Sequence, residues 1–200
     1  TLTVTPAALT ITGLKAADRS YDGTTTVALT GGELAGVLPG DDVTADMPAV
    51  GEVADANVGE GKAVVLKDVV LSGADAGNYT LVLPDVFVTI TKATPTITIK
   101  ADPAALTGSG TVTLTVEKPE DGEVSVTCDK ADVKVTPNKE NGTFSATLPN
   151  SSETYTFTAA VKYGENANYV DGTAPCTVTV TYQSTSHGGG GSSRGSSYAV

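Results

Sequence analysis

The 200-residue sequence has very few of the side chains that carry out acid–base and metal chemistry. It holds two cysteines and a single histidine, His187, which lies in a Gly/Ser-rich tail. No Ser/His/Asp or Cys/His arrangement can therefore form inside a folded domain, and no Cys/His cluster has the spacing of a zinc site. The glycine run 188–191 follows no strand and precedes no Lys-Ser/Thr pair, so we interpret it as a linker and not as a phosphate-binding loop.

Large aromatic side chains are also scarce, because the chain has no tryptophan and only three phenylalanines. Paired carboxylates could in principle cleave glycosides. A sugar-binding cleft, however, needs an aromatic platform that this composition hardly supplies. Together with the missing nucleophile–base pairs, this predicts a protein that is not an enzyme.

Basic residues are outnumbered, with 12 Lys and Arg against 23 Asp and Glu, for a net charge of −11. A surface of this sign repels phosphate backbones and anionic lipid, so we expect no nucleic-acid partner. No apolar run is long enough to cross a bilayer, so we expect no membrane insertion. We expect a monomer that its self-repelling surface keeps in solution.

Valine, threonine and alanine are abundant, in short runs separated by Gly, Pro, Asn and Asp. β-Branched residues suit pleated strands better than helices, and turn residues at this spacing favour a sandwich or a barrel. No helical periodicity of useful length is present. The fold class that we predict is all-β: two tandem immunoglobulin-like β-sandwich modules with a flexible C-terminal tail.

The strand pattern twice shows a strand, a short joint containing proline and a new strand, around Pro6 and around Pro95. We interpret this repeated pattern as that of a tandem array of modules connected by short, stiff linkers. The expected divisions are the end of a preceding module at 1–5, a first module at 6–93, a second module at 94–182 and a Gly/Ser-rich linker at 183–200.

Each module is expected to consist of short strands. Those of the first module are 8–14, 24–29, 43–45, 49–54, 63–71, 79–83 and 86–91; those of the second are 96–100, 111–117, 123–128, 133–136, 142–148, 155–163 and 176–182. The run 63–71 changes face near Lys67-Asp68, which predicts a β-bulge there. Seven strands in the second module are the number that an immunoglobulin-like sandwich needs.

Four motifs occur in order along the first module. They are Arg19-Ser20-Tyr21-Asp22-Gly23-Thr24-Thr25, Gly40-Asp41-Asp42-Val43, Asn57-Val58-Gly59-Glu60-Gly61-Lys62 and Leu71-Ser72-Gly73-Ala74-Asp75-Ala76-Gly77-Asn78-Tyr79-Thr80-Leu81. In this order they resemble the YDG-type repeat of bacterial surface proteins and large adhesins, over about residues 14–92. The resemblance implies tandem arrays on secreted or wall-attached proteins, and it implies no catalytic activity.

The chemistry of these motifs is that of turns and loop anchors. Glycine supplies positive φ and aspartate closes an Asx-turn. A tyrosine where a loop enters a strand typically buries its ring and hydrogen-bonds its hydroxyl to loop backbone, as a tyrosine corner does. The residues that we predict to be structural are Tyr21, Asp22, Gly23, Asn78 and Tyr79 in the first module and Tyr169 in the second.

The end of the second module reads as a Tyr-Thr strand from Tyr155, an Ala167-Asn168-Tyr169 loop and a Thr-Val-rich last strand, 177–180. This resembles bacterial immunoglobulin-like (Big) domains, over about residues 94–182. That family usually has Gly-Asp before Ala-Asn-Tyr, where this chain has Glu165-Asn166. The resemblance implies the fold and a surface location, and it implies hardly anything about a ligand.

A calcium site is the alternative to the expectation that the chain binds no cofactor. Asp41, Asp42 and Asp46 cluster in one loop-and-strand stretch, and Asp55 could approach from the next. Hard cations take several oxygen ligands, carboxylates among them. No EF-hand or nonapeptide spacing is present, so we favour solvated turn acids and expect no cofactor.

Cys128 and Cys176 share the side-chain parity of inward-facing residues. In immunoglobulin strand order their strands flank a third one, and Cys128 ends its strand whereas Cys176 begins its own. The two would then lie at opposite ends of the sandwich, although a disulfide needs Cα atoms within about 7 Å. An even count outside the cell favours a bond, but the strand order carries more weight, and we predict two free thiols that are at least half buried.

The function that we expect is that of a non-catalytic stalk in an extracellular, adhesin-like protein, secreted or attached to a cell wall of the Gram-positive kind. Its partners would be the neighbouring modules of the same chain. One alternative is a module whose loops bind a host glycan or protein, for which Tyr163 and Tyr169 give the one hint. Another is an accessory module of a secreted carbohydrate-active enzyme.

Overall fold

The computed structural model describes residues 5–120 and 122–184, which form two compact units. Unit 1 is Thr1–Pro95 with Lys162–Gly172, and unit 2 is Thr96–Val161 with Thr173–Val200. The first division of the chain falls after Pro95, close to the expected boundary at 93/94. Unit 1 also takes in the segment 162–172, which the sequence pattern assigns to the second module. Most of the terminal segments 1–5 and 183–200 lies outside the described residues.

Unit 1 is built from many very short strands and one 3₁₀ turn. They are β1 (Ala7–Thr12), β2 (Lys15–Ala16), β3 (Arg19–Ser20), β4 (Thr26–Thr30), β5 (Glu33–Ala35), β6 (Thr44–Ala45), β7 (Val50–Glu52), β8 (Gly59–Val64), β9 (Leu71–Ser72), η1 (Ala76–Asn78), β10 (Tyr79–Val82) and β11 (Val86–Thr91). The strands pair as β10-β1-β5, β3-β11-β8, β2-β4-β7 and β6-β9.

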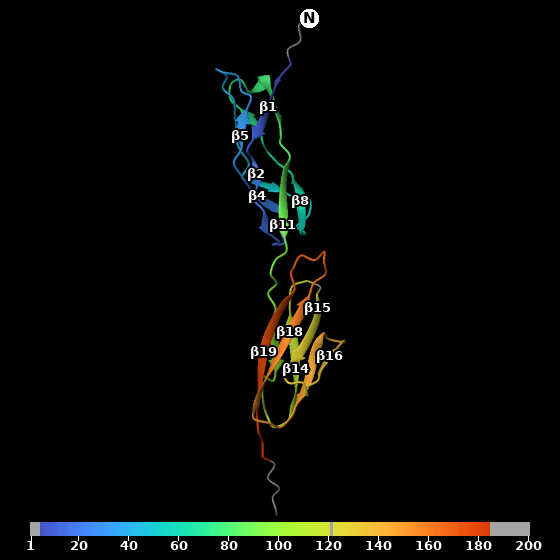
Figure 1. The fold of residues 1–200 in the computed structure, drawn as a ribbon. Coiled ribbons are helices and arrows are strands. Elements are labelled where there is room, and N and C mark those ends of the chain that lie inside the picture. Colours follow the sequence, from blue (N-terminus) through green and yellow to red (C-terminus); the bar gives the residue numbers. More distant parts are fainter. Residues whose placement is uncertain (1–4, 121, 185–200) are drawn as a thin grey trace, which may run out of the picture. The chain divides into compact units, whose positions relative to one another are not determined.

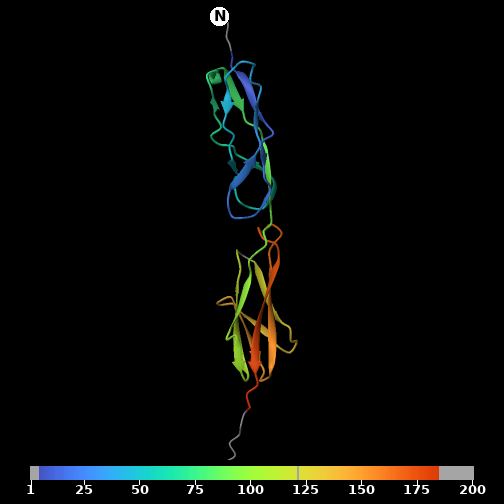
Figure 2. The same cartoon turned by 90° about the vertical axis from the view of Figure 1, so that its left-hand side faces the viewer.

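Two separate apolar clusters hold unit 1 together. Figures 1 and 2 show that β1, which contributes to one cluster, and β11, which contributes to the other, lie toward different ends of the unit. The smaller cluster is Leu9, Val43 and Tyr79, beneath the sheet that contains β1. The larger one includes Val27 from β4 and the alternating Val86, Val88 and Ile90 of β11. The alternation of inward and outward side chains that the sequence predicts for residues 86–90 is therefore present, because every second residue of β11 is buried.

The predicted continuous strand with a bulge at 63–71 is wrong. β8 ends at Val64, Val65 forms a single bridge with Glu52, and the chain then leaves the sheet. Asp68 adopts a left-handed φ of 59°, outside the extended region of a regular strand. The register of β8 on β11 shifts elsewhere, between Val88 and Ile90. The change of face near Lys67-Asp68 therefore marks the end of a strand and not a bulge.

Unit 2 is a sandwich of two four-stranded sheets. Its strands are β12 (Thr98–Asp102), β13 (Ala105–Thr107), β14 (Gly110–Glu117), β15 (Glu123–Cys128), β16 (Val135–Asn138), β17 (Thr143–Leu148), β18 (Glu153–Lys162) and β19 (Gly172–Thr181). The sheets are β12-β14-β17-β16 and β13-β19-β18-β15, seen as two layers in Figure 2. One continuous core fills the space between them, with Phe157, Val112, Leu114 and Val178 fully buried.

The strands of unit 2 differ most from the expected ones at β13 and at β19. β13 was not expected; it follows Pro103, which has no N–H for the ladder, so β12 stops at Asp102 and the chain joins the other sheet. β19 begins at Gly172, four residues earlier than expected, and passes through Pro175. β13 pairs only with the end of β19, from Thr179 to Thr181. Among the described residues, this edge of the first half of β19 therefore has no neighbouring strand, and it tolerates a proline.

The predicted fold class is confirmed: both units are all-β sandwiches, and the only helical element within residues 5–120 and 122–184 is the turn η1. In the part of the chain that the structure describes, no helix has the length and the apolar character to span a membrane.

Candidate functional site

The first motif of unit 1 forms a closed turn around Asp22. Its carboxylate accepts hydrogen bonds from the N–H (2.8 Å) and the hydroxyl (2.7 Å) of Thr24 and pairs with Arg19. These Thr24 bonds, ahead of the Arg19 charge, hold the pKa of the Asp22 carboxyl below its ordinary value. Gly23 adopts a φ of +78°, the left-handed conformation that this turn needs. Asp22 and Gly23 therefore lie in the expected Asx-turn.

Tyr21 connects this turn to the last strand of the unit. Its N–H donates to the carbonyl of Thr91 (2.8 Å), which continues the parallel pairing of β3 with β11. Its ring packs edge-on against Tyr169, with the ring centroids 5.5 Å apart. Tyr163 packs against Tyr169 at the same centroid distance and is itself buried. These rings pack on one another, so the hint of an exposed ligand platform at Tyr163 and Tyr169 is not supported.

The segment 162–172 contributes a buried amide to unit 1. Asn168 is the one buried polar residue in the part of the chain that the structure describes, at 9% exposure. Its side chain accepts a hydrogen bond from Val58 N–H (3.0 Å) and donates one to the Asn57 side chain (3.1 Å). Both of these partners belong to the third motif of the YDG-type resemblance. The sequence could not reveal this contact, because the partners are more than 100 residues apart.

The second and fourth motifs meet at Tyr79. This side chain is buried, at 6% exposure, and its hydroxyl donates to the Asp41 carboxylate (2.6 Å) while it accepts from Leu38 N–H (3.1 Å). The hydrogen bond to Asp41 raises the pKa of the Tyr79 phenol. The geometry is that of the expected tyrosine corner, extended by a carboxylate that the sequence argument placed in a candidate calcium site.

The neighbouring Asp42 is engaged in the same junction. Its carboxylate accepts from Ala74 N–H (3.3 Å), and its N–H donates to the Asp75 carboxylate (2.9 Å). The carbonyl of Asp42 accepts from Asp75 N–H (3.1 Å), and Asn78 N–H closes the η1 turn on Asp75 (3.0 Å). Asn78 acts here through its backbone, whereas its side chain is exposed.

The calcium candidates are not brought together. Asp41 bonds Tyr79, Asp42 bonds the 74–75 turn, and Asp46 lies in a different hollow of the surface. Asp55 instead bonds Lys62 (2.7 Å) and Asn57 N–H (2.9 Å), which hold the pKa of its carboxyl below the ordinary value. Within residues 5–120 and 122–184, no three acidic, histidine or cysteine side chains are placed to hold a metal ion.

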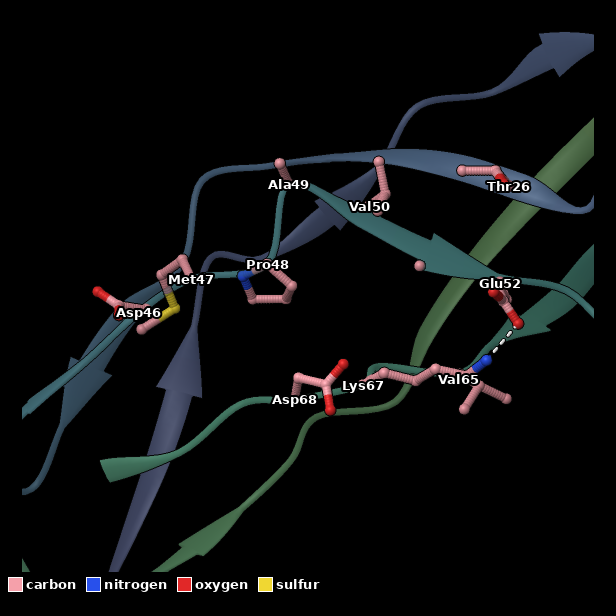
Figure 3. A pocket seen from close by; sticks show the side chains of 11 residues that line it. Thr26, Asp46, Met47, Pro48, Ala49, Val50, Glu52, Val65, Lys67 and Asp68 are labelled. Carbon is pink, nitrogen blue, oxygen red and sulfur yellow. Dashed lines mark hydrogen bonds and ion pairs between the residues drawn. The ribbon is translucent and has the colours of Figure 1, made fainter. Parts of the chain in front are cut away.

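A surface hollow of about 380 Å³ is the candidate for ligand binding that the sequence argument missed. Figure 3 shows Met47 and Pro48 on one side of it and Val65, Lys67 and Asp68 on the other. We call it the β7 slot; its lining residues are Thr26, Asp46, Met47, Pro48, Ala49, Val50, Gly51, Glu52, Val65, Lys67 and Asp68. It opens where the chain leaves the sheet after Val65.

The two cysteines lie on the inward face of unit 2. Both are partly buried and free, and they pack against the core. Cys176 is inside β19 and not at its beginning, so the expected placement at opposite ends of the sandwich is wrong. β15 and β19 nevertheless flank β18, as the strand-order argument assumed. Strands two apart are separated by about 9.5 Å, which exceeds the reach of a disulfide.

We expect both thiols to react slowly in the native protein. Burial raises the pKa of Cys128 and of Cys176, so little thiolate is present at neutral pH. Labelling with a maleimide under non-reducing conditions should modify two thiols rapidly only after denaturant is added, and one thiol in the Cys176→Ala variant. Labelling that needs a reductant would show that a disulfide exists and that the strand order is wrong.

The comparisons with known proteins concern the first unit and the fold. Residues 5–86 match the family model described as YDG domain. No curated protein gives a significant match.

Solved structures similar to this chain are tandem β domains. The titin domains Z1Z2 in complex with telethonin are 15% identical, over 90% of this chain and 98% of that one, with a TM-score of 0.33. The fibronectin(III)-like modules of CbhA from Clostridium thermocellum are 15% identical, over 88% and 94%, with a TM-score of 0.27. Domains 5–6 of the S-layer protein SbsC are 16% identical, over 87% and 96%, with a TM-score of 0.28. Because these TM-scores are all below 0.5, the fold is defined by the sheets described above and not by the similarity to these structures.

Proposed function

We propose, from the match of residues 5–86 to the YDG domain, that this chain is a non-catalytic structural part of a bacterial surface protein. In this proposal the two units form a stalk that carries an adhesive region of the same protein, and unit 2 is a bacterial immunoglobulin-like (Big) domain. The proposed location is extracellular, secreted or on a Gram-positive type of cell wall. In this proposal the chain is a monomer and its partners are the neighbouring modules of the same protein. It binds no cofactor and no nucleic acid, and it does not insert into a membrane.

The observation that supports the proposal is that the polar side chains of the motifs form hydrogen bonds within unit 1. Asp22, Asp41, Asp42 and Tyr79 each make their hydrogen bonds to other groups of unit 1. A carboxylate or hydroxyl that already holds a turn or a loop gains little by turning toward a ligand, because it would leave a donor or an acceptor unpaired. The motif therefore supports a scaffold function better than a binding function.

The Tyr79→Phe variant tests this use of the motif. The change leaves Leu38 N–H and Asp41 without the hydroxyl, so we expect the melting temperature of unit 1 to fall by a few degrees. Because the folded-state pKa of Tyr79 is raised, the stabilisation is present below the ordinary phenol pKa and is lost as the pH rises through the folded value. The difference between wild type and variant should therefore shrink at strongly alkaline pH.

Tyr182→Phe is the matched control, because Tyr182 is 59% exposed. Its melting temperature should equal that of the wild type. All three proteins are also screened on glycan arrays. An unchanged melting temperature for Tyr79→Phe, combined with lost binding of a glycan that the wild type binds, would contradict the structural role.

The extracellular location needs its own experiment. Antibodies raised against the purified chain should label intact, unpermeabilised cells of the source organism or be captured by its culture medium. Labelling that appears only after permeabilisation would rule out the proposed location while leaving the structural role of the motif intact.

A further inference from the structure

We propose that the β7 slot binds an extended peptide segment of another protein in which an apolar residue is flanked by basic residues. The segment adds as a short strand to the open edge of β7. This goes beyond the structural role proposed above, because a stalk does not require such a site. Three features of the slot carry the inference: an open backbone edge, an exposed apolar lining and unpaired negative charge.

The open edge follows from the register of β7 on β4. Leu29 N–H bonds Ala49 C=O (2.9 Å) and Val53 N–H bonds Thr25 C=O (3.0 Å), so the odd-numbered residues of β7 face β4. The backbone groups of Val50 and Glu52 then point to the other edge. Glu52 uses both of its groups on Val65, at 3.1 Å and 2.8 Å.

At Val50 the same pairing is interrupted. An antiparallel ladder would place residue 67 opposite residue 50, but the chain has turned away through Asp68 with its φ of 59°. In the part of the chain that the structure describes, the backbone groups of Val50 have no partner. An unpaired N–H and C=O on a strand edge form the template for an added strand.

The lining of the slot supplies the apolar contact. Val50 is 54% exposed and Val65 is 55% exposed, and both line the slot together with Met47 and Pro48. A volume of about 380 Å³ is large enough for one aliphatic side chain and part of the backbone that carries it. Burying such a side chain between Val50 and Val65 removes apolar surface of both partners from water.

The charge of the slot defines the partner. Lys67 is paired with Glu52 (2.5 Å), as the dashed line in Figure 3 shows. Asp46 and Asp68 lack a basic partner among the residues that the structure describes. The slot thus carries two uncompensated negative charges, and the whole chain has a net charge of −11, so a second copy of this chain would be repelled. A basic segment is complementary.

The experiment uses two fluorescein-labelled probes, the pentapeptide Lys-Val-Thr-Val-Lys and the same peptide with glutamate in place of both lysines. We expect an anisotropy titration at low salt to show saturable binding of the lysine probe alone, with weaker binding at high salt. In a ¹⁵N NMR titration, the amides of Val50 and Val65 should shift most. No binding, equal binding of both probes, or shifts centred elsewhere would overturn the proposal.

Paired charge variants separate the slot from general attraction to an acidic protein. Asp46→Asn with Asp68→Asn should weaken binding of the lysine probe roughly threefold to tenfold, because two weak exposed ion pairs are lost. Glu60→Gln with Asp85→Asn removes the same charge from exposed positions of unit 1 outside the slot and should leave binding nearly unchanged. An equal loss in both double variants would overturn the proposal.

A backbone variant tests the added strand. Val50→Pro removes an N–H that unit 1 does not use, so unit 1 should fold while the probe loses a hydrogen bond. If this variant is unfolded by circular dichroism, Val50→Lys serves instead, since Val50 is exposed and the new charge repels the probe. Wild-type affinity in a folded variant would contradict the site. None of these results depends on whether the motif residues are structural.

Discussion

Replacing Gly73 by alanine should lower the free energy of unfolding of unit 1 by about 3 kcal/mol or more, because strain and overpacking add. Gly73 has a φ of +112°, a conformation that L side chains rarely adopt. An added Cβ would lie 2.2 Å from the carbonyl oxygen of Asp42 and 2.8 Å from its carbonyl carbon. Backbone atoms cannot rotate out of the way, so the junction between the second and fourth motifs must open. Urea denaturation followed by circular dichroism measures the change.

Gly77→Ala is the matched control in the same motif. A Cβ at Gly77 would meet no atom within 4 Å, and its φ is not in the left-handed region. We expect a change within about 0.5 kcal/mol, as for surface substitutions in general. If Gly73→Ala were as stable as Gly77→Ala, the close approach of the two motifs would be wrong.

The Phe157→Ala variant should destabilise unit 2 by about 3–5 kcal/mol. Phe157 is 0% exposed and is among the largest fully buried side chains of the described chain. It lies on β18 and belongs to the one continuous core of unit 2. Alanine would leave a cavity that the two facing sheets could close only by moving closer together, which the other core side chains between them resist. Differential scanning calorimetry should show the transition of unit 2 at a lower temperature.

Phe87→Ala is the control for this change, because Phe87 is 57% exposed on β11 of unit 1. It removes the same atoms with little loss of buried surface, so we expect a small effect. Equal shifts for the two variants would contradict the assignment of Phe157 to the core.

The strands that the sequence predicted best are those with strict alternation. Val86, Val88 and Ile90 alternate in the sequence and are buried in the structure, since one face of β11 covers the core. The beginning of β19 was predicted less well. In the sequence Pro175 looks like a boundary before the strand, and only the pairing of β19 in the described structure shows that a proline is tolerated there. The distinction depends on tertiary pairing, which no local pattern contains.

For the candidate site, the local turn chemistry was predictable and its pairing was not. The Asx-turn at Asp22 involves residues two apart, so the sequence contains all of it. The bond between Tyr79 and Asp41 joins residues 38 apart, and the Asn168 contacts reach still further. The β7 slot gave one signal, the change of face near Lys67-Asp68, which was interpreted as a bulge. Both a β-bulge and the end of strand pairing change which side chains face the core, so the two cannot be distinguished from the sequence pattern.

The parallel pairing of an early strand with the last one occurs in both units, and it decides how each would respond to tension. In unit 1, Arg19 and Ser20 of β3 lie beside Ile90 and Thr91 of β11. In unit 2, residues 105–107 of β13 lie beside 179–181 of β19. A pull along the chain draws such neighbours past each other lengthwise. The hydrogen bonds between them are then loaded together in shear, instead of being opened one after another as in a hairpin that is peeled from its end.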